Sequence, residues 1–305
     1  MHTATLEETK EKKFVTMTSV IAAIFLTATK LIVGIMTGSL GILSEALHSG
    51  LDLIAAVMTY FAVKLADTPP DENHNYGHGK IENISALFET LLLLITCIWI
   101  IYEATERILF DHPPIEVNIW SFSVIILSII IDISRSRALM RVAKKYNNQA
   151  IEADALHFST DILSSAVVLV GLAGSYFFDY HEADSIAALF VGLIVVGISY
   201  RIGKKSIDAL LDKKPDISSD RILEISKLVE EIKWVHDIKL RTSGSQIFID
   251  LNIHVDPELK IGDAHFVAHR FESLLKIEFE RASIHIHIEP DKFYNKGESK
   301  NVQKT

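Results

Sequence analysis

The sequence predicts an α-helical integral membrane protein with six transmembrane helices and a C-terminal cytoplasmic α+β domain. Of the 305 residues, 49% are hydrophobic, and the mean hydropathy of +0.27 is high for a chain with 23% charged residues. Up to about Arg201 the chain divides into apolar windows of roughly 18 to 25 residues, the length that a helix needs to cross a bilayer. Beyond Lys204 these windows stop, and patterns of a small soluble domain follow.

The apolar windows are numerous, and each is long enough for one membrane crossing. A buried soluble helix can imitate one window, but the run WSFSVIILSIII at 120–131 among five others favours a membrane protein over a soluble bundle. The predicted spans are 14–36, 40–65, 81–108, 117–134, 151–177 and 185–200.

Basic residues predict that both termini face the cytoplasm, because Lys and Arg are enriched in short cytoplasmic loops. They precede the first window, fill the loop between the fourth and fifth, and follow the sixth, whereas 110–116 and 178–184 contain none. We expect a multi-pass protein of a plasma or bacterial inner membrane, in contact with lipid. The formal charge of −9 argues against a nucleic-acid partner.

The segment after the last window predicts a two-layer domain. Residues 218–232 have helical periodicity with a serine or aspartate available as a cap, and 246–255 alternate as a strand does. A second helix is expected at about 263–279 and a last strand at 283–288. With Ser243-Gly244 as a hairpin turn, the order is αββαβ.

The expected organisation therefore has four parts. A cytoplasmic N-terminal segment comprises residues 1–13, and the transmembrane domain comprises 14–205. The cytoplasmic domain comprises 206–291. The polar tail 292–305 is expected to be disordered.

Two near copies, ALHSGLD and ALHFSTD, place a histidine and an aspartate four residues apart inside the second and fifth windows. On a helix such residues share a face, so His48 with Asp52, and His157 with Asp161, form two half-sites. Ionisable groups at membrane depth cost roughly 2.5 to 3.5 kcal/mol each on insertion scales, so they usually have a partner. Two imidazoles and two carboxylates form a tetrahedral set that suits a divalent metal such as zinc.

Other readings of these motifs are weaker. One HxxxD motif alone is equally compatible with a hydrogen bond between helices, but two copies, each preceded by Ala-Leu, favour a metal site. Neither copy resembles the HExxH pattern of zinc proteases. Because protein ligands would use all four positions, little room remains for a catalytic water, and we expect a carrier and not an enzyme. The single cysteine, Cys97, excludes a disulfide within the chain and a cysteine-based metal cluster.

The motifs in combination resemble the cation diffusion facilitator family. The resemblance rests on the paired HxxxD motifs, the loop DENHNYGHGK at 71–80, the sequence GSLGILSEALHS before the first motif and the ending IHIHIEP. It covers about 13–290 and implies a homodimeric secondary transporter that exports divalent metal in exchange for protons. It also implies that the transport site consists of His48, Asp52, His157 and Asp161, a set similar to that of the zinc-transporting branch.

The resemblance implies further positions near the membrane domain. Asp71, His74 and His78 match a family metal site in the loop after the second span; the alternative is a solvated connection whose histidines have no role. Lys80 matches a residue that pairs with an acid after the sixth span, which by position is Asp212.

In the cytoplasmic domain the family pattern is only partly kept. Asn252 stands in place of a bridging histidine and Glu289 in place of an aspartate, and the alternative ligands include His254, His269 and Asp250. Alternation in SIHIHI places His285 and His287 on one strand face. The ligands that the resemblance implies are His236, His265, His287 and Glu289.

Zinc is the expected cargo and regulatory ion, and no organic cofactor is expected. Metal and protons compete for the same groups because a ligand must be deprotonated to bind metal, and histidine titrates near neutrality. Iron, cobalt, cadmium and manganese are alternative cargoes, because ligand type ranks these ions without excluding them. A membrane metal receptor that does not transport is the alternative from another class, and uptake into vesicles would distinguish the two.

Overall fold

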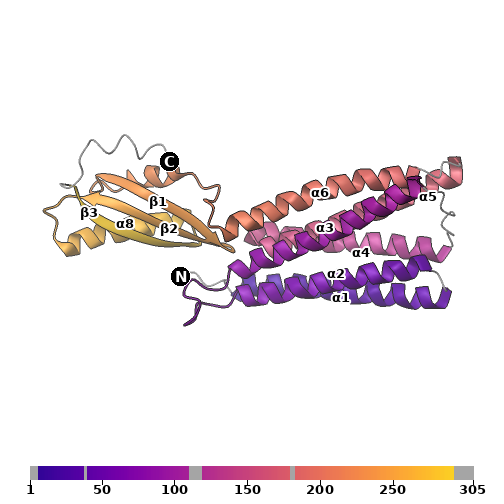
Figure 1. The fold of residues 1–305 in the computed structure, drawn as a ribbon. Helices are drawn as coiled ribbons and strands as arrows, with labels where there is room; N and C mark the ends of the chain where they lie inside the picture. Colours follow the sequence, from indigo (N-terminus) through magenta and orange to yellow (C-terminus); the bar gives the residue numbers. More distant parts are fainter. Residues whose placement is uncertain (1–5, 38–39, 110–118, 179–182, 292–305) are drawn as a thin grey trace. The chain divides into compact units, whose positions relative to one another are not determined.

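The computed structural model describes residues 6–37, 40–109, 119–178 and 183–291. The chain forms two compact units, one comprising Ala4–Ile207 and one that runs from Asp208 onward. The first unit contains the long helices and the second contains a small sheet with its helices (Figure 1). The predicted fold class, a helical membrane domain followed by a small α+β domain, is confirmed. The predicted tail 292–305 lies outside the described residues.

The first unit has six helices, each of 27 to 32 residues. At 1.5 Å per residue, each is long enough to cross a bilayer core of about 30 Å. By apolar length, three segments among the described residues qualify as membrane spans: Leu6–Met36, Ala46–Ala66 and Lys80–Glu106. The six helices are α1 (Leu6–Thr37), α2 (Leu40–Ala66), α3 (Lys80–Leu109), α4 (Ile119–Tyr146), α5 (Gln149–Phe178) and α6 (Ala183–Leu210).

The first helix is longer than predicted, because the apolar window begins at residue 14 and α1 begins at Leu6. Glu7 and Glu8 lie in the first turn, where carboxylates interact favourably with a helix N-terminus. Lys12 is buried, and its ammonium lies 3.3 Å from Glu8 and also contacts Asp67, just after α2. Ion pairs therefore accompany the helix where it extends beyond its apolar part.

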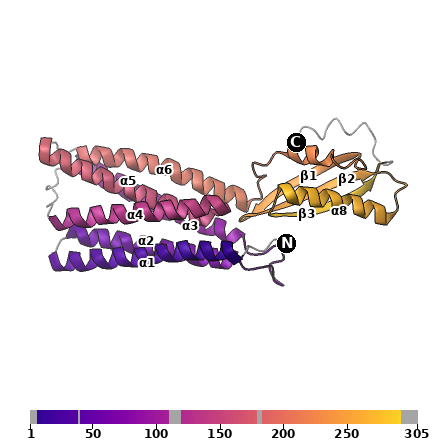
Figure 2. The same ribbon diagram turned by 180° about the vertical axis from the view of Figure 1, so that it is seen from behind.

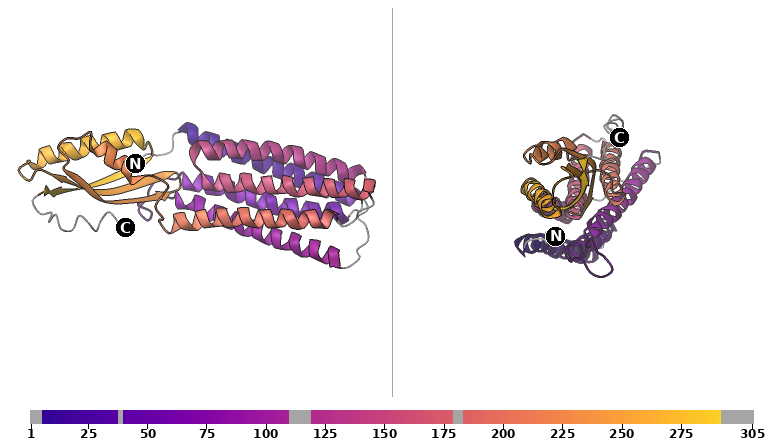
Figure 3. Two further views of the ribbon diagram at one scale, coloured as in Figure 1. Left: turned by 90° about the horizontal axis from the view of Figure 1, so that it is seen from above. Right: turned by 90° about the vertical axis from the view of Figure 1, so that its left-hand side faces the viewer.

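The helices run side by side as a bundle (Figure 1 and Figure 3). α1 packs on α2 and α4, and α5 packs on α3 and α4. Small residues such as Ala23, Ala56 and Ala155 are buried between helices, which allows their backbones to approach closely. Large apolar side chains, including those of Trp99 and Phe190, are exposed on the outside of the bundle, as expected for a surface that contacts lipid.

The second unit contains two helices and a three-stranded sheet in the order α7 (Ser219–Ser226), β1 (Trp234–Ser243), β2 (Gln246–Val255), α8 (Ile261–Glu278) and β3 (Ala282–Pro290). The predicted αββαβ order is therefore confirmed. β2 is the central strand, antiparallel to β1 and parallel to β3. A two-residue turn that includes Gly244 at φ 59° joins β1 to β2, as predicted, because glycine adopts positive φ without strain.

The first helix of this domain is shorter than predicted. The Ser218 side chain caps α7 by accepting a hydrogen bond from the amide of Asp220, but α7 ends at Ser226 and does not reach Ile232. Tighter turns follow, with the amide of Val229 donating to the Ser226 carbonyl at 3.1 Å. The apolar side chain of Val229 stays buried, so the periodicity continues although the α-helix does not.

The core of the domain lies between one face of the sheet and α8, which Figure 2 shows in front of the strands. Ile249, Leu251 and Ile253 of β2 contribute to this core together with Phe271 and Leu275 of α8. Because side chains alternate along a strand, the intervening residues point to the opposite face of the sheet. On β2 and β3 these residues include Asp250, Asn252, His254, His285, His287 and Glu289.

Candidate metal centres

Helices α2 and α5 bring the four residues of the paired HxxxD motifs together. The Nε2 atom of His157 lies 3.0 Å from Oδ1 of Asp52 and 3.6 Å from Oδ2 of Asp161. The Nε2 atom of His48 lies 3.6 Å from Oδ1 of Asp161 and 3.9 Å from Oδ1 of Asp52. Each imidazole therefore faces one carboxylate of its own helix and one of the neighbouring helix.

With one ligand atom from each residue, His48, Asp52 and Asp161 lie within 4.8 Å of one another, as one ion would require, and His157 contacts both carboxylates. Zinc binds imidazole nitrogen and carboxylate oxygen at about 2.0 to 2.2 Å, so neighbouring ligand atoms of a tetrahedral site lie about 3.3 to 3.6 Å apart. The four nitrogen–oxygen distances, 3.0 to 3.9 Å, lie close to that range. The His157 side chain is only 4% exposed, whereas that of His48 is 33% exposed. Of the two imidazoles, that of His48 is therefore the more accessible.

The surroundings of this cluster contain buried charges of both signs. Arg135 of α4 is buried, and its Nη1 atom lies 3.1 Å from Oδ1 of Asp132. Its other nitrogens donate to Ser19 of α1, and its guanidinium stacks on the ring of Phe158 at 3.6 Å from the centroid. Phe158 follows His157, so this contact fixes the part of α5 that carries the ligand.

Asp71, His74 and His78 form a second cluster in the loop between α2 and α3. Oδ1 of Asp71 accepts hydrogen bonds from the amides of Asn73 at 2.9 Å and His74 at 2.6 Å. The ring atom Nδ1 of His74 lies 3.2 Å from Oδ1 of Asp71, and Nε2 of His78 lies 3.4 Å from Oδ2. Ligand atoms of all three residues lie within 4.8 Å of one another, as one ion would require.

The Asp71 carboxylate is prepared to bind a cation at neutral pH. The hydrogen bond from the amide of His74, followed by that from Asn73, lowers the pKa of the Asp71 carboxyl. A lowered pKa means that these hydrogen bonds order the loop above the ordinary pKa of aspartate and are lost as the pH falls through the lowered value. Protonation of Asp71 therefore does not compete with metal near neutrality.

The predicted pairing of Lys80 with Asp212 involves both units. Lys80 is the first residue of α3, and Asp212 follows α6 in the second unit. Within that unit, a carboxylate oxygen of Asp212 lies 4.0 Å from Nη1 of Arg241. The pairing with Lys80 stays a prediction.

A third cluster lies on the sheet face opposite α8 and consists of His236, His254 and Glu289. The two Nε2 atoms of the histidines are 3.0 Å apart, and Oε2 of Glu289 lies 3.3 Å from that of His254 and 3.6 Å from that of His236. The Asn252 side chain donates to the other Glu289 oxygen at 2.8 Å, and the Trp234 ring stacks on His236. Two imidazoles and one carboxylate form a donor set for zinc that leaves one coordination position open.

The composition of this third cluster differs from the predicted set. His236 and Glu289 take part, but His254 occupies the position that we expected for His265 and His287. His265 lies on the exposed side of α8, which covers the other face of the sheet. His287 is 63% exposed and approaches only the second Glu289 oxygen, at 3.7 Å. Strand alternation favours His254 among the alternative ligands, because Asn252 and His254 share one face of β2.

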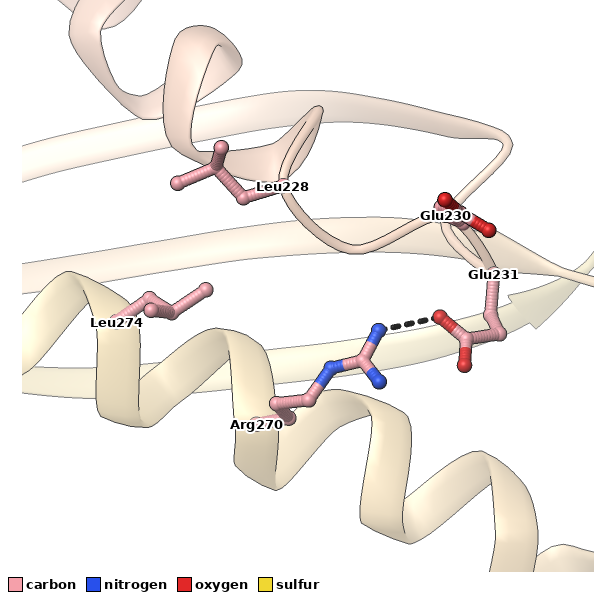
Figure 4. A pocket seen from close by; sticks show the side chains of 5 residues that line it. All are labelled: Leu228, Glu230, Glu231, Arg270 and Leu274. Carbon is pink, nitrogen blue, oxygen red and sulfur yellow. Dashed lines mark hydrogen bonds and ion pairs between the residues drawn. The ribbon is translucent and has the colours of Figure 1, made fainter.

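A shallow pocket lies between the turns after α7 and helix α8 (Figure 4). Arg270 points toward Glu231 and pairs with it, and Leu228, Glu230 and Leu274 complete the lining. Hydrogen bonds from its own amide and from Arg270 lower the pKa of the Glu231 carboxyl. Because the guanidinium is already paired with this carboxylate, we assign the pocket no role in binding metal.

The parts of the chain that match known protein families contain all three clusters. A family model described as the cation efflux transmembrane domain matches residues 16–211, and one described as the cation efflux protein cytoplasmic domain matches 215–291. An uncharacterized transporter of Methanocaldococcus jannaschii is 35% identical over 275 residues, which cover 88% of this chain and 96% of that protein. The cation-efflux pump FieF of Yersinia enterocolitica is 30% identical over 257 residues, covering 83% and 84%. The FieF protein of Shewanella oneidensis is 28% identical over 279 residues, covering 91% and 94%.

Proposed function

This chain belongs to the cation efflux family, and from that premise we propose that it exports Zn²⁺ in exchange for protons by alternating access. Membership in the family supports export of divalent metal cations and a transporter without enzymatic activity. The observation that carries the choice of zinc is the cluster of His48, Asp52, His157 and Asp161, whose four nitrogen–oxygen distances lie close to those expected between the ligands of a zinc ion. Two imidazoles beside two carboxylates suit zinc better than the all-oxygen sets that manganese prefers.

Proton exchange follows from the chemistry of the same four groups. A bound cation requires neutral imidazoles and ionised carboxylates, so protons must leave before the metal binds. After the metal leaves, a proton on Nε2 of His157 can be donated to Asp52, 3.0 Å away. Loading with metal on the cytoplasmic side and with protons on the other side would couple the two gradients.

The remaining organisation is part of the proposal. The match of 215–291 to the family's cytoplasmic domain supports a homodimer. Six long helices and the distribution of basic residues support six spans with both termini in the cytoplasm. We place the membrane domain at 14–205 and the cytoplasmic domain at 206–291.

Transport of several metals into proteoliposomes tests the main proposal. Uptake of zinc is expected to exceed that of iron, cobalt, cadmium or manganese, and to accelerate when the pH gradient drives protons outward through the same protein. Vesicles without protein supply the background. Uptake that does not depend on the pH gradient would contradict proton exchange. Faster uptake of another metal would contradict zinc as the main cargo. No uptake of any metal would favour a receptor.

Metal sensing is the proposed role of the third cluster. A cation that binds His236, His254 and Glu289 would favour whichever arrangement of the two cytoplasmic domains binds it best, because differential affinity shifts such an equilibrium. The open coordination position would accept water or a group from the second copy.

We expect His254→Ala to reduce the zinc bound by the full-length protein by one ion per chain, because removal of one of three ligands leaves too few donors. Equilibrium dialysis of the purified protein measures this number. His285→Ala is the matched control, since His285 lies on the same sheet face but outside the cluster, and we expect it to bind as the wild type does. Equal stoichiometry in His254→Ala and wild type would contradict the assignment.

A further inference from the structure

A buried lysine lies beside the transport cluster. Lys30 of α1 is 5% exposed, and its ammonium donates to the hydroxyl of Ser49 at 2.8 Å. Ser49 is itself buried and directly follows His48, a ligand of the cluster. A charged side chain inside a membrane helix is costly, so its position requires a reason beyond filling space.

The charge of Lys30 acts on the acidic groups around the cluster. The hydrogen bond of Lys30 to Ser49 holds the ammonium beside the residue that follows His48, and thus in the surroundings of the cluster's carboxylates. Asp132 already has Arg135 at 3.1 Å, whereas Asp52 is a ligand that a cargo cation would also contact. A cation at the transport cluster would therefore lie near a positively charged side chain of the protein.

A purely structural role does not require this charge. Thr27, one turn before Lys30 on the same face of α1, donates from its hydroxyl to the Ser49 carbonyl at 2.9 Å. This neutral hydrogen bond already connects α1 to the ligand-bearing part of α2. The ammonium adds a second contact to the same residue, and what distinguishes it is its charge.

We propose that Lys30 competes electrostatically with the transported cation, so that the cluster binds divalent metal weakly enough to release it. Like charges repel strongly where the surroundings are poorly polarisable, and the ammonium raises the free energy of the metal-bound state. After the metal leaves, the same ammonium partly compensates the Asp52 carboxylate. A transport site must release its cation as well as bind it, and the charge of Lys30 lowers the affinity to a value at which release is possible.

Charge-changing variants of the full-length protein test this inference, which rests on the proposed function. Zinc affinity is measured by calorimetry in detergent, in a background that carries His74→Ala and His254→Ala to disable the other two clusters. Lys30→Gln keeps a donor for Ser49 without the charge, and we expect it to bind zinc at least about tenfold more tightly. In proteoliposomes its KM for zinc should fall and its kcat should fall as well.

Two further variants separate charge from structure. Lys30→Arg keeps the charge and is expected to bind with an affinity near that of the background protein. Thr27→Val removes the neutral hydrogen bond to Ser49 and is also expected to leave the affinity near that value. Equal or weaker zinc binding in Lys30→Gln would overturn the inference while leaving the proposed function intact. A parent protein that binds no zinc at this cluster would overturn both.

Discussion

Asp161→Asn is expected to reduce zinc uptake into proteoliposomes to the background of vesicles without protein. The amide keeps the volume of the side chain but removes the negative charge that faces both His48, at 3.6 Å, and His157, at 3.6 Å. Loss of an outer-shell partner alone weakens metal binding by about 10- to 100-fold, and loss of a ligand should exceed that.

Glu152→Gln is the matched control for this prediction, because it makes the same acid-to-amide change on the same helix, α5. Glu152 pairs with Lys205 at 2.6 Å, and both side chains are substantially exposed. Exposed ion pairs contribute little to stability, so the control should transport zinc at a rate close to that of the wild type. Uptake by Asp161→Asn at the rate of this control would remove Asp161 from the transport site.

Phe271→Ala is expected to destabilise the cytoplasmic domain by about 3 to 5 kcal/mol, the usual cost of removing a fully buried phenylalanine. Phe271 is 0% exposed and lies in the core between α8 and the sheet. Domains of this kind are stable by only about 5 to 15 kcal/mol, so this loss is a substantial fraction of the free energy of unfolding. Hydrogen exchange of the full-length protein should show strongly reduced protection of the β2 amides of Ile249 and Leu251.

Phe266→Ala supplies the control for that experiment. Phe266 is the same residue type on the same helix, but it is 66% exposed. Its removal creates no cavity in the core, and exchange in β2 should match the wild type. Unchanged protection in Phe271→Ala would show that α8 does not hold the sheet in the way that the packing indicates.

Helix boundaries show where sequence patterns were informative and where they were not. Apolar length located the central part of the helices, but α1 begins before its window and α4 continues to Tyr146, beyond the predicted end at residue 134. Both extensions carry charged residues whose partners are distant in the sequence, Lys12 with Asp67 just after α2 and Lys145 with Glu11 of α1. A hydropathy window does not predict these extensions, because it averages over neighbouring residues and the partners of the charged side chains are distant in the sequence.

The three clusters differ in how far local spacing could define them. In the HxxxD motifs, the helical repeat places His48 with Asp52 and His157 with Asp161, so each half-site follows from the sequence. Asp71, His74 and His78 are likewise near neighbours in one loop. The third cluster has one residue on each of the three strands. Which residues meet there depends on the strand register, which pairs Trp234 with His254 and His254 with Glu289.

By itself, the sequence determined that this protein has apolar helices, an αββαβ domain and two pairs of histidine and aspartate on shared helix faces, since helix and strand periodicities are local properties. Only the tertiary structure decided that α2 and α5 face each other, that His254 joins His236, and that Lys30 lies beside Ser49. Those outcomes depend on which faces of distant segments pack together. That choice depends on removing polar groups from lipid in the first unit, on removing apolar surface from water in the second, and on close packing in both, so no short stretch of residues encodes it.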